Sequence, residues 1–435
     1  MASGTRRQRG AGLALLIAVA LWRGSPQAQS TAPAWPQVGG PNRNFIVPDA
    51  PRLAESWPES GPPVVWSRPL GPGHSAIVAE DGRLYTMYRP LGPGPRTFVA
   101  EEIVIAMDAA TGRTLWEHKY VSPLEDTSQG SGPHSTPLIA GDRLFAFGTN
   151  KQVHAFDKRS GKLVWSHDLV KEFGAPELLV RPVVKAGYGC SPIAYRDTII
   201  CFVGGPGQAV VAFRQSDGGV VWKSGDFLTS DAPPILIRFE GEEQLVIFAG
   251  AAIYGMNPAT GRVLWSHVHD PGNDFNFSPP LWGDDNILFM SSAYKMGSRA
   301  IRLKRDGDRT LTEELWYVDR AKFQFLNALR VGDYVYGTSG SLGVAFLMAL
   351  DVKTGAIKWQ QRGFAQSTLL YADGKAIILD EDGDLAMLRL TPDGMTVLAQ
   401  ANVFKTRSWT VPTLVGATLY ARDREKIAAF DLAAR

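Results

Sequence analysis

Two histidines stand at a spacing that metal sites often use, in the sequence His267-Val268-His269. Alternate residues of a β-strand point to the same face, so both imidazoles would face one ion. However, His118, His167 and His267 each stand two residues after a tryptophan. A position that recurs in this way indicates a structural role, and we predict no metal site here.

A run of acidic residues at 380–384, Asp-Glu-Asp-Gly-Asp, is the second candidate for metal chemistry. A calcium-hand loop needs Gly at its sixth position and Glu at its twelfth, whereas this run has Gly383 fourth and Thr391 twelfth. The run separates two apolar segments, 376–379 and 385–390, so we predict a polar hairpin turn. The sequence also contains no motif of nucleophilic hydrolases, phosphate-binding loops or zinc peptidases. We therefore predict no catalytic residue.

Cys190 and Cys201 are the only cysteines. The segment between them predicts a hairpin that turns near 195–197, which would place the two thiols on neighbouring strands. A disulfide is allowed if they lie opposite each other in an exported chain. A register shifted by one residue would leave two buried thiols instead.

The first thirty residues predict a secretory signal peptide. Arg6, Arg7 and Arg9 precede an apolar run at 11–22, and small and polar residues follow. This run is shorter than the roughly 20 residues of a membrane-spanning helix, and an uncleaved membrane anchor is the alternative. No later segment is apolar enough to span a membrane, so we expect a soluble protein, periplasmic or extracellular.

The formal net charge of +2 comes from this leader. Residues 1–30 contain four Arg and no acid, which leaves about −2 for the rest of the chain. A nearly neutral chain without a basic stripe excludes a nucleic-acid partner. We expect the exported protein to be a monomer.

An eleven-residue phrase organises the chain. A small residue is followed two positions later by a polar residue, usually Asp or Asn, then by Thr-Gly or a related pair, and after three more residues by Trp. Upstream of each copy, two short β-branched segments flank a tight turn, which predicts four strands per unit. Such units, each with a Trp and a glycine turn, are typical of a β-propeller. The copies with one fixed spacing begin at Ala106, Ala155, Ala212, Gly255 and Ala349.

The length of the chain predicts eight blades, with seven as the alternative. The spacing between successive tryptophans of the phrase averages about 49 residues, and the chain from Phe45 onward has room for eight such units. The last unit supplies only three strands, and we expect Val64-Val65-Trp66 to add its outer strand and close the ring. The chain then divides into a signal peptide (1–30), a lead-in segment (31–63) and one propeller domain (64–435).

Seven tryptophans are predicted to dock neighbouring blades. Each would stack on the next blade and donate its indole N–H to a backbone carbonyl there. The small residue leaves room for the ring, the polar residues bind the N–H groups of the turn, and Gly adopts a positive φ. These residues are Trp66, Trp116, Trp165, Trp222, Trp265, Trp316 and Trp359.

In a propeller, the loops that precede the inner strands gather around the axis on one face, where binding usually occurs. The last residues of these loops would line a funnel able to hold a small molecule or a peptide. The alternative is a channel that only caps the inner strands. The candidates are His74, His134, Tyr188, Asp231, Phe277, Asn327, Gln366 and Trp409.

The phrase resembles the tryptophan-docking repeat of the PQQ-like (pyrrolo-quinoline quinone repeat) propeller superfamily, over nearly the whole chain. The segment 35–43, Trp-Pro-Gln-Val-Gly-Gly-Pro-Asn-Arg, resembles the opening of exported bacterial members of unassigned role. The resemblance implies two different functions for proteins of this fold. One is that of the quinoprotein alcohol dehydrogenases, and the other is that of non-enzymatic scaffolds such as the propeller lipoprotein of the outer-membrane β-barrel assembly machinery. The fold alone does not choose between them.

The dehydrogenases of this family hold PQQ on the propeller axis between a Trp and a disulfide of adjacent cysteines, with a calcium ion held by acidic and amide groups. Cys190 and Cys201 are not adjacent, and the sequence has no haem-attachment motif. The leading hypothesis is therefore a non-enzymatic binding scaffold of the cell envelope, without a cofactor and with an envelope protein or peptide as partner. The alternative is a PQQ-dependent alcohol or sugar dehydrogenase with a divergent axial site, which would use PQQ with calcium.

Overall fold

The computed structural model describes residues 34–434, apart from 95–96, 98, 124–129, 178–186, 274, 325–326 and 341–343, together with residues 1, 2 and 4. Pro33–Arg435 forms one compact unit and Met1–Ala32 a second. The predicted signal peptide lies almost entirely outside the described residues. Within the described ranges, no helix is both long and apolar enough to cross a membrane.

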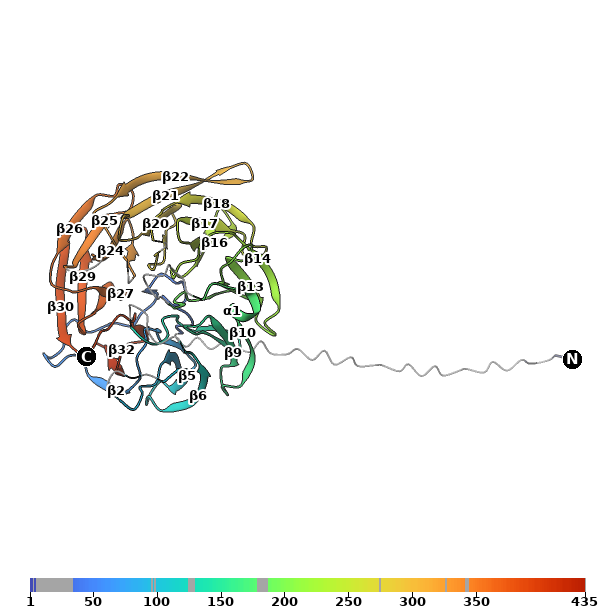
Figure 1. Cartoon of the computed structure of the whole chain (residues 1–435), viewed down its shortest axis with the longest axis horizontal. Helices are drawn as coiled ribbons and strands as arrows, with labels where there is room; N and C mark the ends of the chain where they lie inside the picture. Colours follow the sequence, from blue (N-terminus) through green and yellow to red (C-terminus); the bar gives the residue numbers. More distant parts are fainter. Residues whose placement is uncertain are drawn as a thin grey trace. The chain divides into compact units, whose positions relative to one another are not determined.

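Eight sheets, each with four antiparallel strands, surround a central axis, with the last of these strands on the outside of the ring (Figure 1); the sheet of blade 7 has β1 (Ile46–Val47) as a fifth, parallel strand. Each sheet is one blade, and the prediction of eight blades is confirmed. Blades 1 to 4 consist of β3 (Val78–Glu80), β4 (Arg83–Tyr88), β5 (Glu101–Asp108), β6 (Thr114–Val121); β7 (Leu138–Ala140), β8 (Arg143–Phe147), β9 (Gln152–Asp157), β10 (Leu163–Asp168); β11 (Ile193–Tyr195), β12 (Thr198–Phe202), β13 (Val210–Arg214), β14 (Val220–Ser224); and β15 (Ile235–Phe239), β16 (Glu242–Phe248), β17 (Ala252–Met256), β18 (Val263–Val268).

Blades 5 to 8 continue in the same order, and one short helix, α1 (Leu169–Phe173), follows β10. The strands are β19 (Leu281–Trp282), β20 (Ile287–Ser291), β21 (Ser298–Asp306), β22 (Arg309–Val318); β23 (Leu329–Val331), β24 (Tyr334–Ser339), β25 (Phe346–Asp351), β26 (Ile357–Gln361); β27 (Ser367–Ala372), β28 (Lys375–Asp380), β29 (Asp384–Thr391), β30 (Gly394–Asn402); and β31 (Thr413–Val415), β32 (Thr418–Arg422), β33 (Lys426–Asp431) with β2 (Val64–Pro69).

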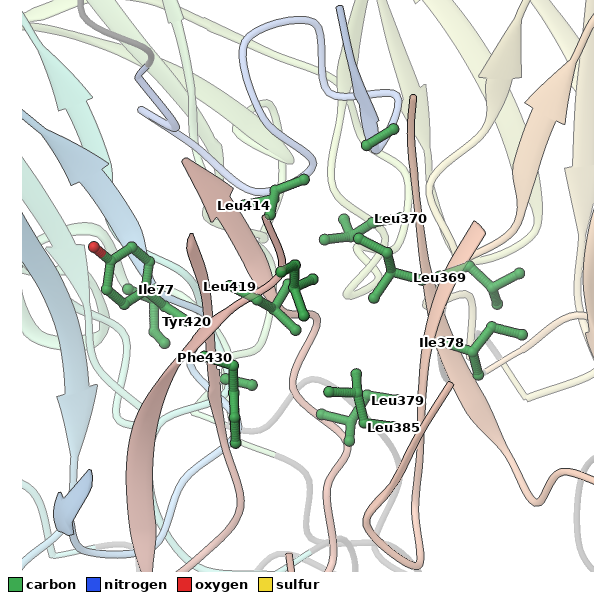
Figure 2. Packing of buried hydrophobic residues seen from close by; sticks show 14 of the residues in the cluster. Ile77, Leu369, Leu370, Ile378, Leu379, Leu385, Leu414, Leu419, Tyr420 and Phe430 are labelled. Atoms are coloured by element: carbon green, nitrogen blue, oxygen red, sulfur yellow. The ribbon is translucent and has the colours of Figure 1, made fainter. Parts of the chain in front are cut away.

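The two ends of the propeller pair with each other. β2 is the outer strand of blade 8, antiparallel to β33, with Trp66 opposite Ala429. This is the predicted closure, and it leaves no blade short of a strand. Between blades 7 and 8, Leu379 and Leu385 of one sheet and Leu419 and Phe430 of the other belong to a single buried cluster (Figure 2).

A β-bulge precedes the docking position in every blade. The pairing of the outer strand with the third strand shifts by one residue in all eight sheets. After the bulge, each docking Trp lies opposite the small residue of its phrase, as Trp116 lies opposite Ala106. In blade 7 the first paired residue after the bulge is Ala399, opposite Met387, and Gln400 lies opposite Ala386 one residue further on. A bulge also twists the exposed edge of each blade, which hinders edge-to-edge pairing.

The predicted docking bonds are present for six of the seven tryptophans, whose indole N–H groups donate to backbone carbonyls of the next blade. The prediction is wrong for Trp265, whose Nε1 donates to Gln244 Oε1 of its own blade at 2.7 Å. The reason lies in blade 5, where the long hairpin of β21 and β22 replaces the tight Thr-Gly turn that supplies the carbonyl elsewhere.

Candidate functional site

A cavity of about 150 Å³ lies where the loops before the inner strands converge. It contains six of the eight residues that the sequence proposed for the funnel. We call it the axial pocket and define it by its lining residues: Val38, Phe45, His74, Ala76, His134, Thr136, Gly189, Ser191, Asp231, Pro233, Phe277, Pro279, Asn327, Trp409 and Val411.

The lining follows a two-residue period at the entrance to six of the eight inner strands. His74 and Ala76, and likewise Asp231 and Pro233, are two positions apart and both face the pocket. Extended backbone sends alternate side chains to the same side, so the second member of each pair joins the first. The sequence analysis named only the first members, and this alternation is the signal that would have found the others.

The N-terminal segment 35–47, which we call the N-terminal plug, contributes Val38 and Phe45 to the pocket wall. The sequence analysis treated this segment as a lead-in and missed its role. Trp35 forms a β-bridge with Ala79 of blade 1, and β1 (Ile46–Val47) runs parallel to β27 of blade 7. Between these two contacts, Arg43 bonds to the carbonyl of Pro192 at blade 3, opposite blade 7, so the plug crosses the axis. β1 pairs with the last residues of β27, so the plug closes the end away from the loops and the pocket opens towards the face that carries them.

Arg43 fastens the plug to blade 3. Its guanidinium is buried, and it donates to the carbonyls of Pro192 at 2.8 Å and Ser191 at 3.2 Å, and to Gln37 Oε1 at 3.0 Å. Burial lowers the pKa of Arg43 to about 10, so the group remains charged at neutral pH. Carbonyl dipoles stabilise this charge, since all three of these acceptors are carbonyl oxygens.

Three aromatic side chains from blades 8, 1 and 2 form one side of the pocket. The ring centroids of His74 and Trp409 are 5.4 Å apart, and those of His74 and His134 are 5.0 Å apart. The Trp409 ring is held by a bond from its Nε1 to Glu381 Oε2 at 2.8 Å, with the Arg407 guanidinium 4.4 Å from its centroid. The wall is therefore a fixed aromatic surface.

His134 is neutral at neutral pH. Its Nε2 lies 3.1 Å from the carbonyl oxygen of Gly130, and burial lowers its pKa to about 4. Within this shift of the pKa, the positive charge of Arg424 acts in the same direction as burial, whereas the Gly130 contact opposes it. The carbonyl contact makes Nε2 the protonated nitrogen in the neutral ring, since a carbonyl only accepts.

Asp231, on blade 4, is the one acidic side chain among the lining residues. Its Oδ1 accepts the backbone N–H of Gly189 at 2.8 Å. A Cβ on Gly189 would lie 2.9 Å from Asp231 Cγ, so this approach requires glycine. Burial raises the pKa of Asp231 to about 7, although the bond from Gly189 and the charge of Lys151 oppose this shift.

The other candidates take structural positions. Asn327 lines the pocket, but its amide exchanges two bonds with the backbone of Leu369, at 2.7 and 3.1 Å. Tyr188 and Gln366 do not line the pocket. Tyr188 is buried instead, with its ring stacked 5.5 Å from that of Phe147, because the extended segment turns it towards the core.

The two cysteines are buried and free. In the β11–β12 hairpin, Ile193 lies opposite Ile200. One step further, this register places Cys201 opposite Pro192 and not opposite Cys190. The disulfide that the sequence allowed is therefore not formed, and burial raises the pKa of both thiols.

The residues considered for metal binding have protein partners. His267 Nε2 lies 3.2 Å from Glu314 Oε2, whereas His269 Nε2 lies 2.9 Å from Ser292 Oγ. The acidic run is the predicted hairpin turn between β28 and β29, and Asp380 Oδ1 accepts two of its backbone N–H groups. Across the described residues, no three His, Cys, Asp or Glu side chains are grouped to hold a metal ion.

The eight blades, the docking tryptophans and the axial pocket define a PQQ-like β-propeller. A sequence model of PQQ-like repeats, described as outer membrane protein assembly factor BamB, matches residues 100–361. This match covers more than half of the chain, so the chain belongs to this PQQ-like repeat family.

Among individual relatives, the chain is 24% identical to the outer membrane protein assembly factor BamB of Yersinia pestis over 328 residues, which covers 74% of this chain and 67% of the relative. The crystal structure of BamB from Moraxella catarrhalis is similar at a TM-score of 0.56 and 15% identity, covering 85% of this chain and 97% of that one. The quinohemoprotein alcohol dehydrogenase of Comamonas testosteroni is similar at a TM-score of 0.63 and 12% identity, covering 93% and 81%. At such identities these two structures share the fold and do not assign an activity.

Proposed function

We propose that this protein is a non-enzymatic scaffold of the cell envelope, exported by residues 1–30, that binds a protein partner at the face carrying the axial pocket. Membership of the family described by an outer-membrane assembly factor supports a scaffolding role. The relative from Yersinia pestis carries the same description and covers most of the propeller.

The composition of the axial pocket is the observation that carries this proposal. Its wall combines aromatic rings, a neutral imidazole and one carboxylate. These groups can stack on a ligand and accept or donate a hydrogen bond. The two hydroxyl groups among the lining residues take part in backbone bonding: Thr136 Oγ1 accepts from Ala76 N, and Ser191 Oγ accepts from Thr136 N.

The similarity to a quinohemoprotein alcohol dehydrogenase favours a second candidate, a PQQ-dependent oxidoreductase. The residues of the axial pocket do not fit a quinone with calcium. Trp409 offers a stacking surface, but Asp231 is the only acidic side chain among the lining residues, and Cys190 and Cys201 are separate buried thiols. Calcium prefers six to eight oxygen ligands, several of them carboxylates.

The test uses the exported chain, residues 31–435, as immobilised bait for an envelope extract, followed by affinity measurements with each purified partner. His134→Ala with Asp231→Ala should abolish binding, whereas Leu311→Ala on the outer strand β22 should leave it unchanged. If the partner binds the double variant and Leu311→Ala equally well, the interface lies elsewhere on the protein. Reduction of a dye by an alcohol in the presence of PQQ and calcium would show instead that the protein is a PQQ-dependent oxidoreductase.

A further inference from the structure

The size of the axial pocket selects the ligand. A cavity of about 150 Å³ has the size of an engineered cavity known to hold one benzene molecule, so the pocket has space for one six-membered ring. The plug crosses the axis behind Val38 and Phe45, so a ligand must enter from the face that carries the loops. A single side chain on an exposed segment can enter in this way, whereas a helix or a strand cannot.

The aromatic wall selects a flat, uncharged group. His74 stands between Trp409 and His134, and the two ring-centroid distances of 5.4 and 5.0 Å form a continuous surface. An inserted ring can pack on this surface in an offset or edge-on geometry. Arg407 lies on Trp409, and the charge of Arg424 acts on His134, so the same side disfavours a cationic side chain.

The polar groups of the pocket select a hydrogen-bond donor. Asp231 stands on blade 4 and Trp409 on the entrance to blade 8, which are opposite each other in a ring of eight. The carboxyl group accepts the backbone N–H groups of Gly189 and Cys190, and its two oxygens have room for a further donor. The Asn327 amide already binds Leu369, and the lining hydroxyls bind backbone groups. Asp231 is therefore the principal acceptor for a ligand.

We propose that the axial pocket receives the phenol ring of a tyrosine in an exposed segment of the partner, with the ring against Trp409 and His74 and the hydroxyl donating to Asp231. This inference rests on the proposed scaffold function. Tyrosine is the side chain that combines one six-membered ring with a hydroxyl donor. The pocket thereby serves as an anchor site at the centre of the binding face.

The first experiment measures binding of p-cresol and of toluene to the exported chain by ligand-observed NMR. The two probes share the ring and differ in the hydroxyl. We expect p-cresol to bind at least tenfold more tightly than toluene. Equal affinities would overturn the role of Asp231, and no binding of either probe would overturn the ring site.

Two variants locate the binding. Trp409→Leu should weaken p-cresol at least tenfold, and Asp231→Asn, which keeps an acceptor for Gly189, should bring p-cresol towards parity with toluene. Leu311→Ala, on the outer strand of blade 5, is the matched control and should behave as the wild type. Circular dichroism and thermal unfolding confirm that each variant is folded. Unchanged p-cresol binding in both pocket variants would overturn the proposal.

A second comparison identifies the source of the ring. The peptide Ac-Gly-Gly-Tyr-Gly-Gly-NH2 should displace p-cresol, and its Phe counterpart should displace it at least tenfold less well. Binding of p-cresol without displacement by the Tyr peptide would show that the pocket takes a free phenol, which overturns the tyrosine assignment. If a captured partner binds the wild type and Trp409→Leu with the same affinity, the axial pocket is not its anchor site. The proposal of a scaffold function would be unaffected by that result.

Discussion

The indole ring of Trp116 lies on Gly161 of the next blade, so that a Cβ atom on Gly161 would come within 2.5 Å of Trp116 Cδ2. The same relationship links Trp66 with Gly112, and Trp222 with Gly261. The glycine of the repeated turn is thus required twice, by its positive φ and by the ring that covers it. This contact, together with the indole hydrogen bond, links the blades at five of the eight boundaries, those of Trp66, Trp116, Trp165, Trp222 and Trp316.

This contact predicts a difference between two glycines of blade 2. Gly161→Ala should destabilise the fold by about 2–4 kcal/mol, since the new methyl group meets the Trp116 ring and the φ of +73° is strained. Gly141→Ala is the control, because its φ is +55° and a Cβ there meets nothing within 4 Å. It should cost about 1 kcal/mol. Urea unfolding measures both, and equal losses would show that the ring contact contributes nothing.

His154 is predicted to be replaceable by an apolar ring. It is buried 4.5 Å from the ring of Tyr120, and in the described structure neither of its nitrogens has a hydrogen-bond partner. His154→Phe should therefore stabilise the fold by about 1–2 kcal/mol at pH 7. His154→Ala, which leaves a cavity, should destabilise it. A loss of stability in His154→Phe comparable to that in His154→Ala would contradict this prediction.

The same substitution should change the pH dependence of stability. Burial lowers the pKa of His154 to about 4 from its ordinary value of 6.5. Between these values the unfolded state binds a proton that the folded state does not, so the wild type loses stability as pH falls from about 6.5 to about 4. The advantage of His154→Phe should grow over this window in thermal unfolding. A constant difference would show that the imidazole is already charged in the fold.

For Asp231 we expect stability to depend on pH in the opposite direction. Burial raises its pKa to about 7, so the folded state keeps a proton that the unfolded state has lost between about pH 4 and pH 7. The contribution of Asp231 to stability should therefore fall as pH rises through this window. Relative to Asp231→Asn, the wild type should become less stable from pH 4 to pH 7 and show no further change above it. A difference independent of pH, measured by thermal unfolding, would contradict the raised pKa.

We expect the hydrogen bonds of Arg43 to stabilise the N-terminal plug against local opening. Arg43→Met removes the donors to the carbonyls of Ser191 and Pro192, which would cost about 1–3 kcal/mol and expose residues 35–47 to hydrogen exchange. Arg159→Met is the control. It removes an ion pair with Asp81 at 3.8 Å whose arginine is 71% exposed, and it should change stability by less than about 0.5 kcal/mol. Equal protection of the plug in both variants would argue against a fastening role.

The fold was largely predictable from the sequence because the repeated phrase is a local signal. Its spacing encodes the turn, the outer strand and the docking ring, and these are the same in each blade. Trp265 is the exception. It belongs to a complete copy of the phrase but donates to Gln244, because the tight turn that would supply its carbonyl acceptor is missing from the following blade. The loss of a Trp in blade 7 did not hide the blade, because its strands keep their alternation.

By itself, the sequence determined the strands, the number of blades, the closure by Val64-Val65-Trp66, and six of the residues that line the axial pocket. These features depend on periods of two and about 49 residues, which are written along the chain. The tertiary structure alone decided that the N-terminal plug crosses the axis, that Tyr188 turns into the core, and that Cys201 does not meet Cys190. The first two depend on packing between segments far apart in the chain, and a local pattern carries no information about which distant surface a side chain will meet. The third depends on the register of the β11–β12 hairpin, which the sequence pattern leaves open by one residue.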